Sequence, residues 1–264
     1  MDFSTVENVL ADYLKMNEQE KKRYITKILG EKIDEFILDT DNDLPLLIHK
    51  KWNLEFVYVP AGSYLRGFTE MNQENAEKIS GIVNANYEEM RPVYSVNVKD
   101  FLVTRTPILN KFRLVGKEDY YPCYCSYECA AKIANKTKMR LPSETEWEYF
   151  ARAGSNTLFP FGNQMLQEKD LVKWMNLDFS NLSETSYNAL GIYGLFTGEW
   201  TSDLYRMNYS DGAEMLSCRT IRGGGAIFWP WQDQEWVWCM SAMRMPSDDL
   251  IDNVCAFRLV FDIN

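Results

Sequence analysis

The sequence is poor in histidine and in positive charge. His49 is the single histidine among 264 residues, and 28 Lys and Arg residues stand against 38 Asp and Glu residues. One imidazole cannot supply the histidine clusters that hold catalytic zinc or non-haem iron, so we expect His49 to be a packing or surface residue. The formal net charge of −10 disfavours binding to nucleic acids or anionic membranes and favours a basic partner.

Long apolar runs and targeting signals are also missing. No segment approaches the roughly 18 apolar residues that a membrane helix needs. The residues that follow Met1 include neither the basic region nor the apolar region of a secretory signal. We therefore expect a cytoplasmic protein with reduced cysteines. The glycines at 223–225 lack the lysine, serine and helix context of a phosphate-binding loop.

The six cysteines have no zinc-site spacing. Cys123, Cys125 and Cys129 form a C-x-C-x3-C pattern, and the other three are scattered along the chain. Structural zinc sites usually pair cysteines as C-x2-C. We predict no metal site here and interpret the thiols as small buried apolar groups.

The N-terminal region of the chain has the signals of two helices. Ser4 with Glu7, and Asn17 with Glu20, each have the spacing of a capping box that starts a helix. Apolar residues at helical spacing predict that the second helix continues to Ile37 and ends in the polar stretch 39–43. We assign residues 1–50 to a helical segment, which is either a cap docked on the main domain or an arm that binds a partner.

The pattern of apolar and turn-forming residues changes after residue 50. Short β-rich runs alternate with turns, and one clear helix stands among them, with a capping box at Ser143 and Glu146 and apolar residues at Trp147, Phe150 and Ala151. The apolar fraction is 46% and the charged fraction 25%, as in ordinary globular proteins. We expect one α+β, loop-rich domain over residues 51–264.

A series of motifs in this domain carries a family resemblance. The segments include residues 56–67 (FVYVPAGSYLRG), 140–149 (RLPSETEWEY), 199–203 (EWTSD), 222–225 (RGGG) and 257–260 (FRLV). Their order resembles the formylglycine-generating enzyme, or sulfatase-modifying factor, domain. The resemblance implies a C-type lectin-like fold of that type, here with an N-terminal helical cap.

The family's catalytic residues are replaced in this sequence. Members that oxidise cysteine to formylglycine share a Gly-Gly-Ser motif, with cysteines three and eight positions after the serine. The thiols of these two cysteines bind copper(I). Here Gly225 takes the serine position, and Phe228 and Asp233 take the cysteine positions. Copper(I) prefers thiolate ligands, so we expect no copper oxidase chemistry and assign no catalytic residue.

Two further branches of the family bear on function. The resemblance to iron-dependent sulfoxide synthases implies a set of iron-binding histidines, which one histidine cannot supply. A branch similar to the periplasmic oxidoreductase of pyoverdine maturation lacks the copper cysteines. It leaves a copper-independent tailoring oxidoreductase as the alternative function, although the chain shows no export signal.

The resemblance also implies a calcium site and structural roles. Members read Gly-Asn-Val-Trp-Glu-Trp where this chain reads TGEW at 197–200. The lost asparagine removes an oxygen ligand, and calcium needs six to eight oxygens, so we expect no cofactor and place Glu199 in a turn cap or in solvent. Arg258 is interpreted as an ion-pair partner and Trp147 as a core residue.

The segment at the lost copper site is aromatic. Four of the eight tryptophans fall within residues 229–238, and tryptophan is prominent at interface hot spots. The candidate binding residues are Phe228, Trp229, Trp231, Asp233, Trp236 and Trp238. The alternative is that Trp236 and Trp238 fill the core of a strand. The favoured function is a catalytically degenerate pseudoenzyme, acting as a binding module for a protein partner of the immunity or adaptor type.

Overall fold

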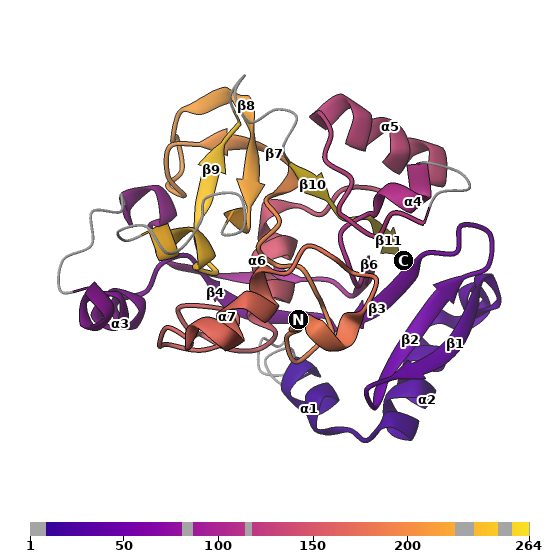
Figure 1. The fold of residues 1–264 in the computed structure, drawn as a ribbon. Coiled ribbons are helices and arrows are strands. Elements are labelled where there is room, and N and C mark those ends of the chain that lie inside the picture. Colours follow the sequence, from indigo (N-terminus) through magenta and orange to yellow (C-terminus); the bar gives the residue numbers. More distant parts are fainter. Residues whose placement is uncertain (1–8, 81–86, 114–117, 225–234, 248–254, 264) are drawn as a thin grey trace.

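Strands from distant regions of the chain form the centre of the molecule (Figure 1). The computed structural model describes residues 9–80, 87–113, 118–224, 235–247 and 255–263. A five-stranded sheet has the order β1-β2-β3-β6-β11, a four-stranded sheet has the order β10-β7-β8-β9, and β4 pairs with β5. The strands are β1 (Phe36–Asp41), β2 (Leu44–His49), β3 (Glu55–Val59), β4 (Gly62–Arg66), β5 (Tyr94–Val98), β6 (Phe101–Thr104), β7 (Glu199–Arg206), β8 (Met215–Arg222), β9 (Arg244–Pro246), β10 (Ala256–Phe257) and β11 (Val260–Asp262).

Helices surround these sheets, and α6 lies near the middle of the view (Figure 1). The α-helices are α1 (Val9–Lys15), α2 (Glu18–Leu29), α3 (Glu70–Ser80), α4 (Asn110–Arg113), α5 (Tyr127–Thr137), α6 (Glu144–Arg152) and α7 (Glu168–Met175). Short 3-10 helices cover Gly30–Glu35, Tyr87–Met90, Leu182–Glu184 and Glu235–Cys239. Among the described residues, no helix has the length and apolar character that crossing a membrane requires.

Helix α6 forms as its sequence predicts. The Ser143 hydroxyl accepts the Glu146 N–H, and the Glu146 carboxylate accepts the Ser143 N–H at 2.8 Å, which completes the capping box. Trp147 and Phe150 are buried in the main core cluster. The helix thereby presents its apolar face to the sheets and places its first residue, Glu144, at a fixed point in the interior.

The N-terminal segment differs from the expected pair of helices. The capping box of Asn17 and Glu20 starts α2 as predicted, but the helix ends at Leu29 instead of Ile37. Residues 36–49 form the β1–β2 hairpin, whose turn residues Asn42 and Asp43 both have positive φ, at 49° and 60°. Asn and Asp tolerate this conformation, which tight hairpin turns require.

The hairpin joins the sheet of the main domain. Strand β2 pairs with β3 through Leu47 opposite Phe56, so the sheet continues across the boundary predicted at residue 50. Tyr13 of α1 contacts Tyr58 of β3 edge-on, with ring centroids 5.4 Å apart. His49 is buried and packs edge-on against Phe36 at 5.1 Å. The segment before residue 51 is therefore not wholly helical, and His49 is a packing residue.

Candidate functional site

The aromatic residues predicted as a binding surface divide into two groups. Phe228, Trp229, Trp231 and Asp233 lie outside the described residues. Trp236 and Trp238 lie on the 3-10 helix Glu235–Cys239, not on a strand as the core alternative supposed. Trp236 is 6% exposed and packs edge-on against Phe159, with ring centroids 5.7 Å apart, and Trp238 packs half-buried against the same core. These two tryptophans thus anchor the C-terminal end of the aromatic segment.

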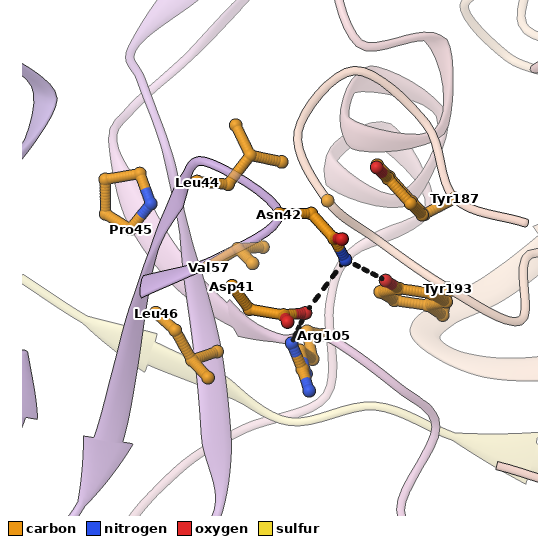
Figure 2. Close-up of a pocket in the computed structure, with 10 residues that line it drawn as sticks. Asp41, Asn42, Leu44, Pro45, Leu46, Val57, Arg105, Tyr187 and Tyr193 are labelled. Atoms are coloured by element: carbon orange, nitrogen blue, oxygen red, sulfur yellow. Dashed lines mark hydrogen bonds and ion pairs between the residues drawn. The ribbon is translucent and has the colours of Figure 1, made fainter. Parts of the chain in front are cut away.

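A small pocket lies where the β1–β2 turn meets the main domain (Figure 2). Its volume of about 10 Å³ is enough for about one water molecule. Arg105 donates to Asp41 at 2.6 Å and to Glu55 at 2.7 Å, and the Asn42 amide donates to the Tyr193 hydroxyl at 3.2 Å. Figure 2 shows the Asp41, Asn42 and Arg105 side chains pointing toward one another. The hydrogen bonds and ion pairs around this pocket hold the β1–β2 turn against the main domain, and the pocket is too small to hold an organic ligand.

A more unusual arrangement surrounds Glu144 at the start of α6. Its carboxylate accepts bonds from Arg66 at 2.9 Å, from Arg222 at 2.9 Å and from Arg244 at 2.5 and 2.9 Å. The Tyr209 hydroxyl adds a longer bond at 3.3 Å. A carboxylate offers about four lone-pair positions, so these donors use its whole capacity to accept. Burial alone would raise the pKa of Glu144, but the three guanidinium groups lower it to about 2.

A second buried carboxylate continues the cluster one helical turn later. Glu148 accepts from Arg222 at 2.9 Å, from Arg152 at 2.9 Å and from the Gly67 N–H at 2.9 Å. Against the burial effect, Arg152 and Arg222 lower the pKa of Glu148. We call the set of two glutamates and four arginines the Glu144 cluster: Glu144, Glu148, Arg66, Arg152, Arg222 and Arg244. It carries two more positive than negative charges.

Three members of the Glu144 cluster, Arg66, Glu144 and Arg244, line a polar pocket of about 420 Å³. Side chains from β4, β5, α6, β7 and β9 and from the β7–β8 loop line it, among them Arg66, Tyr94, Glu144, Asp203, Tyr209 and Arg244. The Tyr209 ring lies between two guanidinium groups, with its centroid 4.0 Å from the guanidinium carbon of Arg66 and 4.6 Å from that of Arg244. Ring and arginines hold one another in place, so the wall of the pocket is preorganised.

Residues 116–263 match the family model of the sulfatase-modifying factor enzyme 1-like domain. The chain belongs to this family. The formylglycine-generating enzymes of Mus musculus and Bos taurus are each 27% identical over 114 residues, covering 37% of this chain. The matched region is 31% of the mouse protein and 30% of the bovine one. The match thus spans about a third of the length of these relatives.

Two solved structures resemble the fold of this sulfatase-modifying factor-like chain. The structure of PvdO from Pseudomonas aeruginosa has a TM-score of 0.54 at 22% identity and covers 80% of this chain and 95% of that one. Treponema denticola variable protein 1 has a TM-score of 0.54 at 14% identity, covering 85% and 98%. The expected family and its α+β, C-type lectin-like fold are confirmed.

The residues at the family's calcium position do not fit a calcium ion. Glu199, which we expected in a turn cap or in solvent, is fully buried, and Arg258 donates to both of its oxygens at 2.8 and 3.0 Å. Trp147 Nε1 and the Thr197 hydroxyl donate to the same carboxylate at 2.9 and 3.0 Å. The expectation for Glu199 is wrong because Arg258 is buried beside it and needs a counter-charge. The ion-pair role of Arg258 and the core position of Trp147 are confirmed.

The residues at the family's copper positions do not fit copper either. Phenylalanine at 228 has no donor atom, and the aspartate at 233 is a hard oxygen ligand, whereas copper(I) prefers thiolates. Over the residues that the structure describes, no group of three or more His, Cys, Asp or Glu side chains is placed to hold a metal ion.

The cysteines are free thiols, and one of them has a polar environment that the sequence did not reveal. Cys123 is buried next to Cys125, and the Arg113 guanidinium lies 3.6 Å from its sulfur. The hydrogen bond with Cys125, together with the one from Arg113, lowers the pKa of Cys123. Cys239 fits the apolar interpretation, because burial raises the pKa of its thiol.

Proposed function

We propose that this chain is a sulfatase-modifying factor-like domain that has lost copper oxidase chemistry and binds a protein partner. The observation that carries the proposal is the donor set at the copper positions, where Phe228 and Asp233 replace two thiols. Neither residue can build a two-coordinate copper(I) site. A fold that keeps its core without its metal ligands is suited to recognition.

The aromatic segment is the surface that we assign to the partner. Trp229 and Trp231 supply large, rigid side chains, and Trp236 fixes the end of the segment in the core. The net charge of −10 favours a partner with a basic surface, because opposite charges accelerate association.

Loss of the oxidase chemistry can be tested by restoring its ligands. The native chain should neither bind copper(I) stoichiometrically nor convert the cysteine of a sulfatase peptide to formylglycine. A triple variant, Gly225→Ser with Phe228→Cys and Asp233→Cys, should gain thiolate-dependent copper(I) binding because it provides two soft ligands. Peptide oxidation by the native chain would sink the proposal.

Partner binding can be tested on a double variant of the aromatic segment. The partner would be identified by its co-purification with the protein from native cells and then purified for calorimetric titration. Trp229→Ala with Trp231→Ala should weaken binding at least about thirtyfold, since an interface tryptophan often contributes ≥2 kcal/mol. The control is Trp52→Ala, which removes a half-buried tryptophan outside the segment. Equal affinities for the two variants would contradict the assignment, as would loss of the cooperative melting transition in the double variant.

A copper-independent tailoring oxidoreductase is the second candidate, and the polar pocket beside the Glu144 cluster favours it. An enzyme of this kind would hold a redox cofactor or a small substrate in such a pocket. Mass spectrometry of small molecules released from the native protein distinguishes the two functions. A redox cofactor released in stoichiometric amount would support the enzyme and argue against the binding module.

A further inference from the structure

Three thiols meet at the start of α5. Cys123 and Cys125 lie on the segment that leads into the helix, and Cys129 lies in its first turn. The thiol of Cys125 forms hydrogen bonds with the thiols of both neighbours. Cys125 is therefore the middle member of a row of three sulfur atoms. We call Cys123, Cys125 and Cys129 the thiol array.

Main-chain hydrogen bonds fix the backbone on both sides of the middle thiol. The Cys125 N–H donates to the Cys255 carbonyl at 3.1 Å. The Cys129 N–H donates to the hydroxyl of Ser126, the N-cap residue of α5, at 3.4 Å. Because Cys125 directly precedes this cap, its side chain lies against the first turn of the helix. Two sulfurs already in hydrogen-bond contact need only short side-chain movements to reach the disulfide bond length of about 2 Å.

The inner two thiols share one proton. The hydrogen bond with Cys125 and the one from Arg113, at 3.6 Å, lower the pKa of Cys123, and Asp119 opposes them. The hydrogen bond with Cys123 raises the pKa of Cys125. Such a coupled pair favours one proton held between two sulfurs, with the negative charge beside Arg113. A shift of this proton toward Cys123 makes Cys125 the thiolate without an external base.

Cys129 connects the thiol array to solvent. Cys123 and Cys125 are 0% and 6% exposed, whereas Cys129 is half-buried. A reagent from solution therefore meets Cys129 first. Because the Cys129 thiol contacts that of Cys125, a group attached to the outer sulfur lies within reach of the middle one. The burial of the three thiols thus sets the order in which they react.

We propose that Cys129 and Cys125 form a reversible disulfide when the protein meets a low-molecular-weight disulfide. The Cys129 thiolate attacks one sulfur of the reagent, and the other sulfur leaves with the electron pair of the broken S–S bond. Cys125 then attacks the Cys129 sulfur and displaces the second small thiolate, while the proton of Cys125 passes to Cys123. The two cysteines lose two electrons, the reagent is reduced to two small thiols, and the two protons end on these thiols. Cys123 is a positioning residue that holds the proton, and the inference does not depend on the protein partner proposed above.

Hydroxyethyl disulfide, a small neutral reagent, tests the proposal on the reduced full-length chain. After alkylation of the remaining thiols, proteolysis after Tyr124 and Glu128 separates the three cysteines for mass spectrometry. We expect a product that lacks two hydrogen atoms, with Cys125 linked to Cys129, and dithiothreitol should reverse it. Arg113→Met should slow the closure of the disulfide about tenfold, because the inner pair then loses the cation that stabilises its thiolate.

A matched pair of variants separates this site from general thiol chemistry. Cys129→Ser should abolish the disulfide, whereas Cys218→Ser, which removes a half-buried thiol on β8, should leave its formation unchanged. Replacing the buried Cys123 can unfold the protein, so the exposed Arg113 decides the role of the shared proton. A disulfide between other cysteines, a mixed disulfide that persists on Cys129, or equal effects of the two serine variants would each overturn the proposal. An unchanged rate in Arg113→Met would overturn the part assigned to the inner pair.

Discussion

Replacement of Glu144 by Gln should destabilise the protein by an amount that depends on pH. The pKa of Glu144 falls from 4.5 to about 2 in the folded chain because Arg244, Arg222 and Arg66 outweigh the effect of burial. A shift of that size corresponds to about 3 kcal/mol of folding free energy at neutral pH. Breaking a buried ion pair typically costs a similar amount, about 3–5 kcal/mol.

The pH dependence follows from where the proton binds. A carboxyl group whose folded-state pKa is depressed stabilises the fold fully above its unfolded pKa, here about 4.5, and loses this contribution as the pH falls toward 2. The difference in unfolding free energy between the native chain and Glu144→Gln should therefore be about 3 kcal/mol at pH 7. By pH 3 it should be less than half of that, because the unfolded chain then binds the proton.

Urea unfolding followed by tryptophan fluorescence at pH 7, 5 and 3 measures this difference directly. Glu128→Gln, which alters an exposed glutamate, serves as the control and should leave the unfolding midpoint unchanged at each pH. A constant difference between the native chain and Glu144→Gln from pH 7 to pH 3 would refute the electrostatic reasoning. Equal midpoints at pH 7 would refute the assignment of Glu144 to a cluster that stabilises the fold.

Two further predictions concern the backbone. Gly223→Ala should cost at least about 2 kcal/mol in unfolding free energy, because φ is +69° and a Cβ would lie 2.3 Å from the Leu195 carbonyl oxygen. Gly212→Ala, where φ is +82° and the space is open, should cost about 1 kcal/mol, so equal losses in thermal unfolding would argue against the collision. A chain that starts at residue 51 should still unfold cooperatively but at a lower temperature, and it should self-associate because the edge of β3 that β2 covers is exposed. An unchanged melting temperature and a monomeric profile in gel filtration would contradict this expectation.

The sequence predicts best where its signals are local. The capping box of Ser143 and Glu146 identifies the start of α6 within one helical turn, and the structure confirms it. The hairpin at 36–49 escapes prediction because Ile33, Phe36 and Ile37 also match helical spacing. The competing signal is Asn42 followed by Asp43, which favours a tight hairpin turn. Pairing with β3 decides between the two patterns, and pairing is a tertiary contact.

The Glu144 cluster could not be predicted in the same way. Arg66, Glu144, Arg222 and Arg244 come from β4, α6, β8 and β9, so their meeting is a property of the topology. The motifs that contain the first three identify the family but give no sign that three guanidinium groups share one carboxylate. For the Glu199–Arg258 pair, the sequence predicts only the arginine's role. An arginine between apolar neighbours needs a buried counter-charge, but the spacing does not reveal which residue supplies it.

The pairing of β6 with β11 affects how the chain is made. Val103 pairs with Val260, so 157 residues separate the two partners along the chain. At synthesis rates of about 5–20 residues per second, roughly 8–30 s pass before the partner of β6 has been made. During that interval the apolar strand has one open edge, which can pair with other chains. Slow translation between β6 and β11 should therefore lower the yield of folded protein, because it lengthens the time for which this edge stays open.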